Sequence, residues 1–156
     1  MTIVTTTAAF LGLLPPLGSL LALDASKRRI GLAGTDPERR LVTPLATFSR
    51  GTWAEDVARL ARVVGEREVA GLVVGLPLNM DGSTGPMAQA TRALARNLDA
   101  AFGLPVLLQD ERLTSFAVRD ALDEGRLPRP RRKGEPLDHY AAAVILEDAL
   151  RALAVG

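Results

Sequence analysis

The spacing of apolar and polar positions changes along the chain, and each change marks the boundary of an expected element. Apolar runs at 19–24 and 29–35, separated by a short polar turn, predict a β-hairpin. Alternating residues over 41–47 predict a third strand, in which Pro44 favours a sheet edge because proline donates no ladder hydrogen bond. The chain is therefore expected to open with an antiparallel meander.

The rest of the chain alternates between helical and extended patterns. Apolar residues recur at helical spacing over 52–65, and the continuous run 69–75 suits a strand buried on both faces. A further strand is predicted at 105–109, and further helices at 86–101, 114–124 and 136–154. Strands that alternate with helices pair in parallel through crossover connections. We therefore predict an α/β fold with a mixed five-stranded sheet and helices on both faces.

Composition limits the classes of protein that remain. A length of 156 residues with 47% hydrophobic content fits one domain with a sizeable core. Lys and Arg total 19 against 18 Asp and Glu, a net charge of +1, so any electrostatic attraction to a partner must be local. The absence of cysteine excludes disulfides, a thiolate zinc site and a cysteine nucleophile, and it favours the reducing cytoplasm.

The first 18 residues stand apart from this pattern. They are apolar, but they carry no Lys or Arg, and Pro15-Pro16 interrupts any helix, so they do not read as a signal peptide. We expect residues 1–18 to be a disordered or mis-started extension and residues 19–154 to form the domain. No run approaches the roughly 20 apolar residues that span a bilayer, so no membrane partner is expected.

Three carboxylates at the ends of elements carry the main chemical signal. Asp24 closes the first strand of the hairpin, Glu111 follows the strand at 105–109, and Asp138 lies in the first turn of the last helix. Neighbouring strands would bring such residues to the sheet edge where ligands collect. Mg²⁺ or Mn²⁺ accepts oxygen ligands and would relieve the repulsion between the carboxylates. This set suits metal-dependent hydrolysis of phosphodiester bonds by activated water.

Each acid also has an ordinary structural explanation. Asp24 could serve only as a turn residue of the hairpin, and Asp138 only as a carboxylate that stabilises its helix N-terminus. Glu111 could pair with the adjacent Arg112, and Asp110 competes with it as a metal ligand.

Several polar residues are candidates for contacts to a nucleic-acid backbone. The loop 76–85 is rich in Gly, Pro and Asn and precedes a helix, and the segment 125–136 carries the only dense basic run. The alternative for both segments is an ordinary solvated loop. The candidates for nucleic-acid binding are Lys27, Arg28, Asn79, Ser83, Arg112, Arg126, Arg129, Arg131, Arg132 and Lys133.

Four blocks of sequence resemble one known family. In order along the chain they are LLALDASKRRIGLAGTDP, VVGLPLNMDGSTGPMAQATRALA, QDERLTSFAVRDAL and LDHYAAAVILEDAL. They resemble the YqgF/RuvX family over about 21–150, and GLPLNMDGSTGP is the most specific match. The resemblance implies a ribonuclease-H-like fold and a Holliday-junction-resolvase-like nuclease that matures the small-subunit ribosomal RNA precursor. It also implies that Asp24, Glu111 and Asp138 bind the metal.

The chain departs from that family just after Asp24. The family usually has Gly two residues later and then Ser or Thr, whereas this chain has Ser26 and Lys27. Loss of the glycine makes the turn less permissive, and Lys27 could contact a phosphate directly. The departure bears on substrate preference more than on catalysis, because all three acids are retained.

The sequence therefore predicts a metal-dependent nuclease that acts on structured nucleic acid. It does not choose between a ribosomal RNA precursor and a four-way DNA junction, and symmetric cutting of a junction would require a homodimer. One rival is a non-catalytic nucleic-acid-binding or ribosome-assembly factor. A second rival, an ATP-dependent phosphotransferase, is disfavoured because such enzymes clamp nucleotide between two lobes and 156 residues supply one.

Overall fold

The computed structural model of the protein describes residues 2–79, 81–111, 124–125 and 138–155. Its strands are β1 (Ile3–Val4), β2 (Ser19–Ala25), β3 (Arg29–Thr35), β4 (Val42–Ser49), β5 (Val69–Leu76) and β6 (Val106–Asp110). Its helices are α1 (Thr7–Leu13), α2 (Trp53–Glu66), α3 (Pro86–Phe102) and α5 (Asp138–Val155). The predicted helix at 114–124 lies, apart from its last residue, outside the described residues.

The strands form one mixed sheet in the order β1-β6-β5-β2-β3-β4. The β2, β3 and β4 strands make the predicted antiparallel meander, and Pro44 lies in the edge strand β4 as expected. The β5 strand pairs in parallel with β2 and β6, so the carboxyl ends of all three strands meet at one edge of the sheet. The predicted mixed α/β sheet is confirmed, but it has six strands where five were expected.

The additional strand comes from the N-terminal segment 1–18, which was expected to be a disordered or mis-started extension. The described residues of this segment form β1 and α1, and a mis-started origin stays a prediction. The β1 strand pairs in parallel with β6, and Thr2 donates a hydrogen bond to the carbonyl of Leu104. Phe10 of α1 has no exposed surface and packs with α5 in the core. The physical reason is that the segment covers the otherwise open edge of β6 and buries an aromatic ring.

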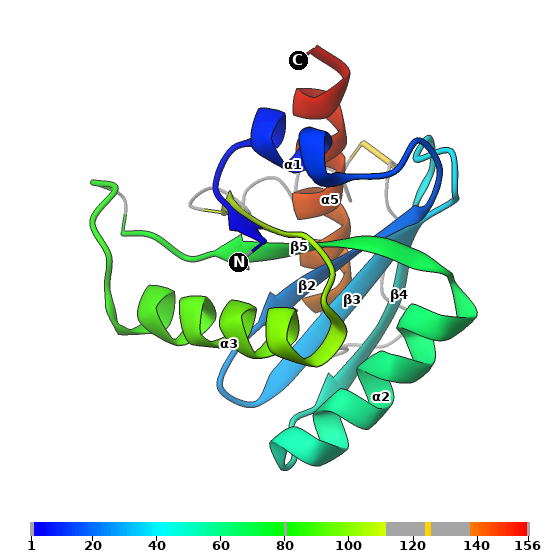
Figure 1. Ribbon diagram of the computed structural model, residues 1–156. Helices are drawn as coiled ribbons and strands as arrows, with labels where there is room; N and C mark the ends of the chain where they lie inside the picture. Colours follow the sequence, from blue (N-terminus) through cyan, green and yellow to red (C-terminus); the bar gives the residue numbers. More distant parts are fainter. Residues whose placement is uncertain (1, 80, 112–123, 126–137, 156) are drawn as a thin grey trace.

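Helices cover both faces of the sheet, as Figure 1 shows. The α2 and α3 helices pack on one face against inward residues such as Leu23, Ile30 and Val74. The α5 helix crosses the other face, joined by α1, and packs on Ala22, Ala33 and other residues of the central strands. Two apolar layers therefore enclose the sheet. Within the described residues, no helix combines the length and apolar character needed to cross a bilayer.

Local sequence signals explain where the helices begin and end. The α2 helix starts after Thr52, whose hydroxyl accepts from the Glu55 amide while the Glu55 carboxylate accepts from the Thr52 amide, a reciprocal capping box. The α3 helix has Pro86 at its first position and ends at Gly103, where φ is 64°. These boundaries fix the lengths of the crossovers that place β5 and β6 beside β2.

Candidate metal and nucleic-acid site

Asp24 and Glu111 meet at the sheet edge formed by the carboxyl ends of β2 and β6. Asp24 continues the alternation of Leu20 and Ala22, whose side chains face α5, so its carboxylate lies on the α5 face. Glu111 follows β6 directly, and its backbone amide donates to the carbonyl of Leu76 at the end of β5. The two partly buried carboxyl groups form a side-chain hydrogen bond with each other.

Two glycines beside Asp24 make room for the other acids. Gly31 is the cross-strand partner of Asp24, and a Cβ there would overlap the backbone carbonyl of Asp138. Gly75 of β5 lies on the other side, where a Cβ would overlap the Glu111 carboxylate and come within 2.6 Å of Ile145 Cδ1. The absence of side chains at these two positions lets the α5 N-terminus and the Glu111 carboxylate approach the sheet.

Burial and mutual repulsion perturb both carboxyl groups. Burial is the main cause that raises the pKa of Asp24 to about 6; the Glu111 hydrogen bond lowers it and the charge of Asp138 raises it. Burial also raises the pKa of Glu111 to about 8, followed by the charge and hydrogen bond of Asp24 and the charge of Asp110. These directions indicate that Glu111 carries a proton at neutral pH and donates it to the Asp24 carboxylate.

Asp138 opens α5 and lies beside this pair, but a basic residue holds its carboxylate. The Nε of Arg29 donates to Asp138 Oδ2 at 2.7 Å, and the Asp138 side chain is only 18% exposed. Asp138 is close enough for its charge to raise the pKa of Asp24. The pairing compensates a carboxylate that would otherwise add a third negative charge to the site.

The start of α5 is anchored on β4. The His139 amide donates to Thr47 Oγ1 at 3.2 Å, and the same hydroxyl lies 2.6 Å from His139 Nδ1. Thr47 is the cross-strand partner of Gly31, the residue beneath the Asp138 backbone. The sheet therefore fixes the backbone of Asp138 on two sides, and His139 serves in this anchor.

The structure brings Asp24 and Glu111 into direct contact and places Asp138 next to them, on Arg29. Among the described residues, no three His, Asp or Glu side chains are grouped as a ready metal site. The shared site of three ligands therefore stays a prediction. Its competitor Asp110 is exposed at the end of β6, and strand alternation after Leu108 directs it to the α2/α3 face, away from Asp24.

The residues present nevertheless suit a divalent cation. Two carboxyl groups that share a proton offer hard oxygen ligands, and a cation would replace that proton. The glycine at position 75 leaves the Glu111 carboxylate space beside Asp24. Asp138 would complete the set only after its carboxylate turns from Arg29.

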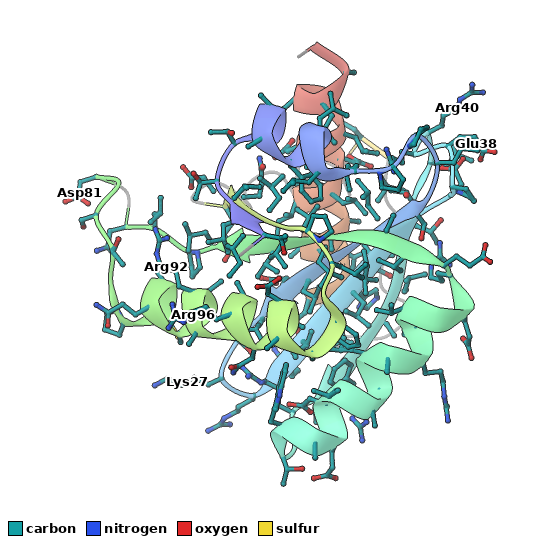
Figure 2. All side chains as sticks on the ribbon, in the orientation of Figure 1. Lys27, Glu38, Arg40, Asp81, Arg92 and Arg96 are labelled. Atoms are coloured by element: carbon teal, nitrogen blue, oxygen red, sulfur yellow. The ribbon has the colours of Figure 1, made fainter. Side chains whose placement is uncertain are left out.

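The predicted contacts at the β2–β3 turn are exposed beside the site. Lys27 and Arg28 lie at the tip of the hairpin, and Figure 2 shows Lys27 projecting outward from it. The Ser26 hydroxyl accepts from the Arg29 amide at 3.1 Å, and no residue of the turn has a positive φ. Serine therefore closes this turn by a hydrogen bond, and the backbone freedom of the family's glycine is not required.

The two predicted contacts in the 76–85 loop bind each other. Asn79 Nδ2 donates to Ser83 Oγ at 2.9 Å, and the Asn79 amide donates to the Ser83 carbonyl at 3.0 Å. The Ser83 amide donates to Asp81 Oδ1. These bonds organise the loop ahead of α3 and occupy donors that a phosphate would otherwise use, so nucleic-acid contact by this loop stays a prediction.

The remaining predicted contacts lie outside the described residues. They are Arg112, Arg126, Arg129, Arg131, Arg132 and Lys133.

Sequence reasoning missed the residues that support the acids. Arg29 adjoins Lys27 and Arg28 in one basic run, but its partner Asp138 is 109 residues away, so no local signal identified the pair. Gly31, Thr47 and Gly75 act by close approach to distant segments, which spacing alone does not reveal.

Comparisons with known proteins agree with this architecture. A family model described as "RuvX: Holliday junction resolvase" matches residues 18–152. A Cereibacter sphaeroides protein named "Putative pre-16S rRNA nuclease" is 49% identical over 141 residues, covering 90% of this chain and 88% of that protein. A Rhodobacter capsulatus protein of the same name is 48% identical over 145 residues, covering 93% of this chain and 91% of that protein.

One solved structure is similar in fold at low sequence identity. The structure of T. thermophilus RuvC in complex with a Holliday junction substrate superposes with a TM-score of 0.54 and 18% identity. The match covers 88% of this chain and 95% of that one, which confirms the predicted ribonuclease-H-like fold. Residues 18–152, which the family model matches, contain nearly the whole sheet and its helices. The chain therefore belongs to the YqgF/RuvX family.

Proposed function

We propose that this protein is a divalent-metal-dependent nuclease that hydrolyses phosphodiester bonds of structured nucleic acid. The observation that carries the proposal is the contact between Asp24 and Glu111, two partly buried carboxyl groups at the carboxyl ends of β2 and β6, the strands on either side of β5. Such a pair costs stability in the absence of a cation, and strained acidic pairs of this kind are typical of functional sites. Membership of the YqgF/RuvX family supports the same reading.

The proposed metal ligands are Asp24, Glu111 and Asp138, and the metal is Mg²⁺ or Mn²⁺. The first two would supply oxygen atoms from the sheet edge, and Asp138 would add one from the first turn of α5. The chemistry that such an ion supplies is polarisation of the phosphoryl group and activation of water. The chain itself holds the acids in place through Gly31, Gly75 and the α5 anchor.

Positive residues at the hairpin tip would hold the substrate backbone. Lys27 and Arg28 are exposed and, within the described residues, make no side-chain ion pair. They can therefore donate hydrogen bonds to a phosphate without breaking an existing ion pair. The predicted basic residues of 125–136 would extend this contact. Asn79 and Ser83 would join it only by exchanging their mutual side-chain hydrogen bond for one to the phosphate. Direct phosphate contacts of this kind give affinity without sequence preference.

The preferred substrate is the precursor of 16S ribosomal RNA, because the relatives with 48–49% identity carry that activity in their names. A four-way DNA junction is the second candidate, since the family model is described as a Holliday junction resolvase. Junction resolution would additionally require a two-fold dimer with two sites. We also propose a cytoplasmic location, with which a chain without cysteine is compatible.

The test offers purified protein three labelled substrates in parallel. These are a precursor 16S fragment with its 5′ leader, a four-way DNA junction and ATP, each with Mg²⁺, Mn²⁺ or EDTA. Wild type is compared with Asp24→Asn and with the matched control Asp148→Asn, which makes the same change at an exposed α5 residue paired with Arg151. We expect cleavage of the RNA that requires metal, is lost in Asp24→Asn and is kept in Asp148→Asn.

Other outcomes separate the rivals. Nucleic-acid binding without cleavage in any metal would identify a binding or ribosome-assembly factor. Hydrolysis of ATP that depends on Asp24 would identify a phosphotransferase-like activity. Cleavage that survives both EDTA and Asp24→Asn would reject the proposed site.

A further inference from the structure

Arg29 connects the acidic site to the solvent. Its Nε donates to Asp138 Oδ2 at 2.7 Å, while 49% of its side chain is exposed. Within the part of the chain that the structure describes, its two terminal amino groups have no partner. The guanidinium therefore satisfies the carboxylate with one donor and offers the others outward, at the foot of the hairpin that carries Lys27 and Arg28.

Asp138 is likewise engaged through one oxygen. Its Oδ1 makes no hydrogen bond within the described segments. The Asp138 charge reaches Asp24, and the backbone beneath it is fixed against Gly31 and Thr47. Because this backbone is fixed, a move of the carboxylate from Arg29 toward Asp24 would be a rotation of the Asp138 side chain and would leave α5 in place.

We propose that Arg29 is a positioning residue that couples phosphate binding to metal binding at this site. In the free protein its guanidinium occupies the Asp138 carboxylate and acts as an internal competitor of the metal. A phosphate of the nucleic-acid strand draws the guanidinium outward and releases Asp138 to the pair formed by Asp24 and Glu111. The inference rests on the proposed metal-dependent nuclease.

The exchange is favoured by the geometry of the groups. A phosphate can accept two parallel hydrogen bonds from an arginine fork, whereas Asp138 receives one. The backbone of Arg29 stays in place because its amide donates to Ser26 Oγ and its carbonyl accepts from the Ser26 amide at 2.9 Å. Two side chains exchange partners while the sheet and helix keep theirs.

If the oligonucleotide and the metal are coupled, each must change the affinity of the other by the same factor. The coupling can therefore be measured in equilibrium affinities as well as in activity. The test measures Mn²⁺ affinity by titration calorimetry on the whole chain, alone and with a short 2′-O-methyl oligonucleotide, after subtracting Mn²⁺ binding to the oligonucleotide itself. Without oligonucleotide, Arg29→Gln should bind Mn²⁺ about three- to fivefold tighter than wild type, the fold-change expected for losing one partly exposed ion pair. With oligonucleotide, the Mn²⁺ affinity of wild type should rise and that of Arg29→Gln should not.

Two further variants separate coupling from a merely structural role. Arg29→Lys keeps the charge but lacks the planar fork, so it should bind Mn²⁺ as wild type does and lose the response to oligonucleotide. Arg62→Gln removes one positive charge from an exposed position of α2, on the opposite face of the sheet, and should behave as wild type. Far-ultraviolet circular dichroism verifies that each variant is folded.

The outcomes distinguish this inference from the proposed function. If Mn²⁺ binding is lost in Glu111→Gln but Arg29→Gln binds Mn²⁺ no tighter than wild type, the acidic site stands and the role of Arg29 is overturned. An oligonucleotide response that survives in Arg29→Gln also overturns it. If wild type binds no Mn²⁺ with or without oligonucleotide, both are overturned.

Discussion

Replacing Glu111 with Gln should stabilise the metal-free protein at neutral pH while removing the proposed activity. Glu111 folds into a position where burial, and then the charge of Asp24, raises its pKa to about 8 from an ordinary value of 4.5. A glutamine has nearly the same shape, can donate the same hydrogen bond to Asp24, and has no proton to acquire. The variant therefore removes an electrostatic cost and keeps the packing.

The direction in which wild-type stability changes with pH follows from whether Glu111 holds a proton in the folded and in the unfolded state. Below pH 4.5 the carboxyl group is protonated whether the chain is folded or unfolded, so it contributes no pH-dependent difference. Between pH 4.5 and about 8 the folded state retains a proton that the unfolded state has lost, so wild-type stability falls as the pH rises. At pH 7 the penalty is on the order of 1–3 kcal/mol, because each unit of separation between pH and the unfolded pKa contributes about 1.4 kcal/mol and Asp24 shares the proton.

Thermal unfolding in EDTA across this pH range provides the measurement. Glu111→Gln should melt with wild type near pH 4.5 and several degrees above it at pH 8, where 1 kcal/mol corresponds to roughly 2–4 °C for a chain of this size. Addition of Mn²⁺ should narrow or reverse the difference, because only wild type gains a ligand that binds the folded state. The exposed Glu66→Gln serves as the control for loss of one carboxylate.

A difference in melting temperature between Glu111→Gln and wild type that does not change with pH would refute the reasoning. So would a Glu111→Gln variant that melts below wild type at pH 8. Either result would mean that Glu111 is not held as a strained acid beside Asp24. Its proposed exchange of a proton for a metal would then lose its physical basis.

Three further changes test other parts of the structure. Gly75→Ala places a methyl group against the Glu111 carboxylate, and should weaken Mn²⁺ binding in calorimetry and cost about 1–3 kcal/mol in denaturant unfolding. Phe10→Ala empties a fully buried position and should cost about 3–5 kcal/mol in the same assay. Changing Lys27 and Arg28 together to Gln should weaken RNA binding and reduce its logarithmic salt slope by about 2.

Each of these three changes has a matched control or a result that would contradict it. Gly65→Ala adds a methyl group where no atom lies within 4 Å and should be neutral or stabilising; a loss equal to that of Gly75→Ala would reject the close-approach argument. Leu11→Ala lies next to Phe10 but is 44% exposed, and should cost much less. An unaltered salt slope in the double variant would remove the hairpin tip from the nucleic-acid contact.

Features encoded by short-range signals were predictable from the sequence. Two apolar runs around a polar turn in 19–35 predicted the hairpin, the proline in 41–47 predicted the edge strand, and helical spacing over 52–65 predicted α2. Asp24 and Glu111 were predicted to meet from neighbouring strands that end at one edge of the sheet. They do meet, but β5 lies between their strands β2 and β6, so the expected strand adjacency was wrong.

Features that depend on distant partners were not predictable in this way. The ion pair between Arg29 and Asp138 joins residues 109 apart, and nothing around either one specifies the other. The β1 strand was missed because two residues show no periodicity; pairing with β6, not local propensity, makes them a strand. In the sequence, Gly31 and Gly75 resemble ordinary strand residues. Their roles depend on the start of α5 and on the Glu111 carboxylate, which take up the space that their side chains would need.

The last helix has a consequence for the life of the chain during synthesis. The α5 helix supplies much of one core layer and also carries Asp138, so all strands of the sheet leave the ribosome before the helix that covers one of its faces. A chain cut short before that helix would lack both a covered sheet and the proposed third ligand. Truncated products are therefore expected to fold poorly and to lack the proposed nuclease activity.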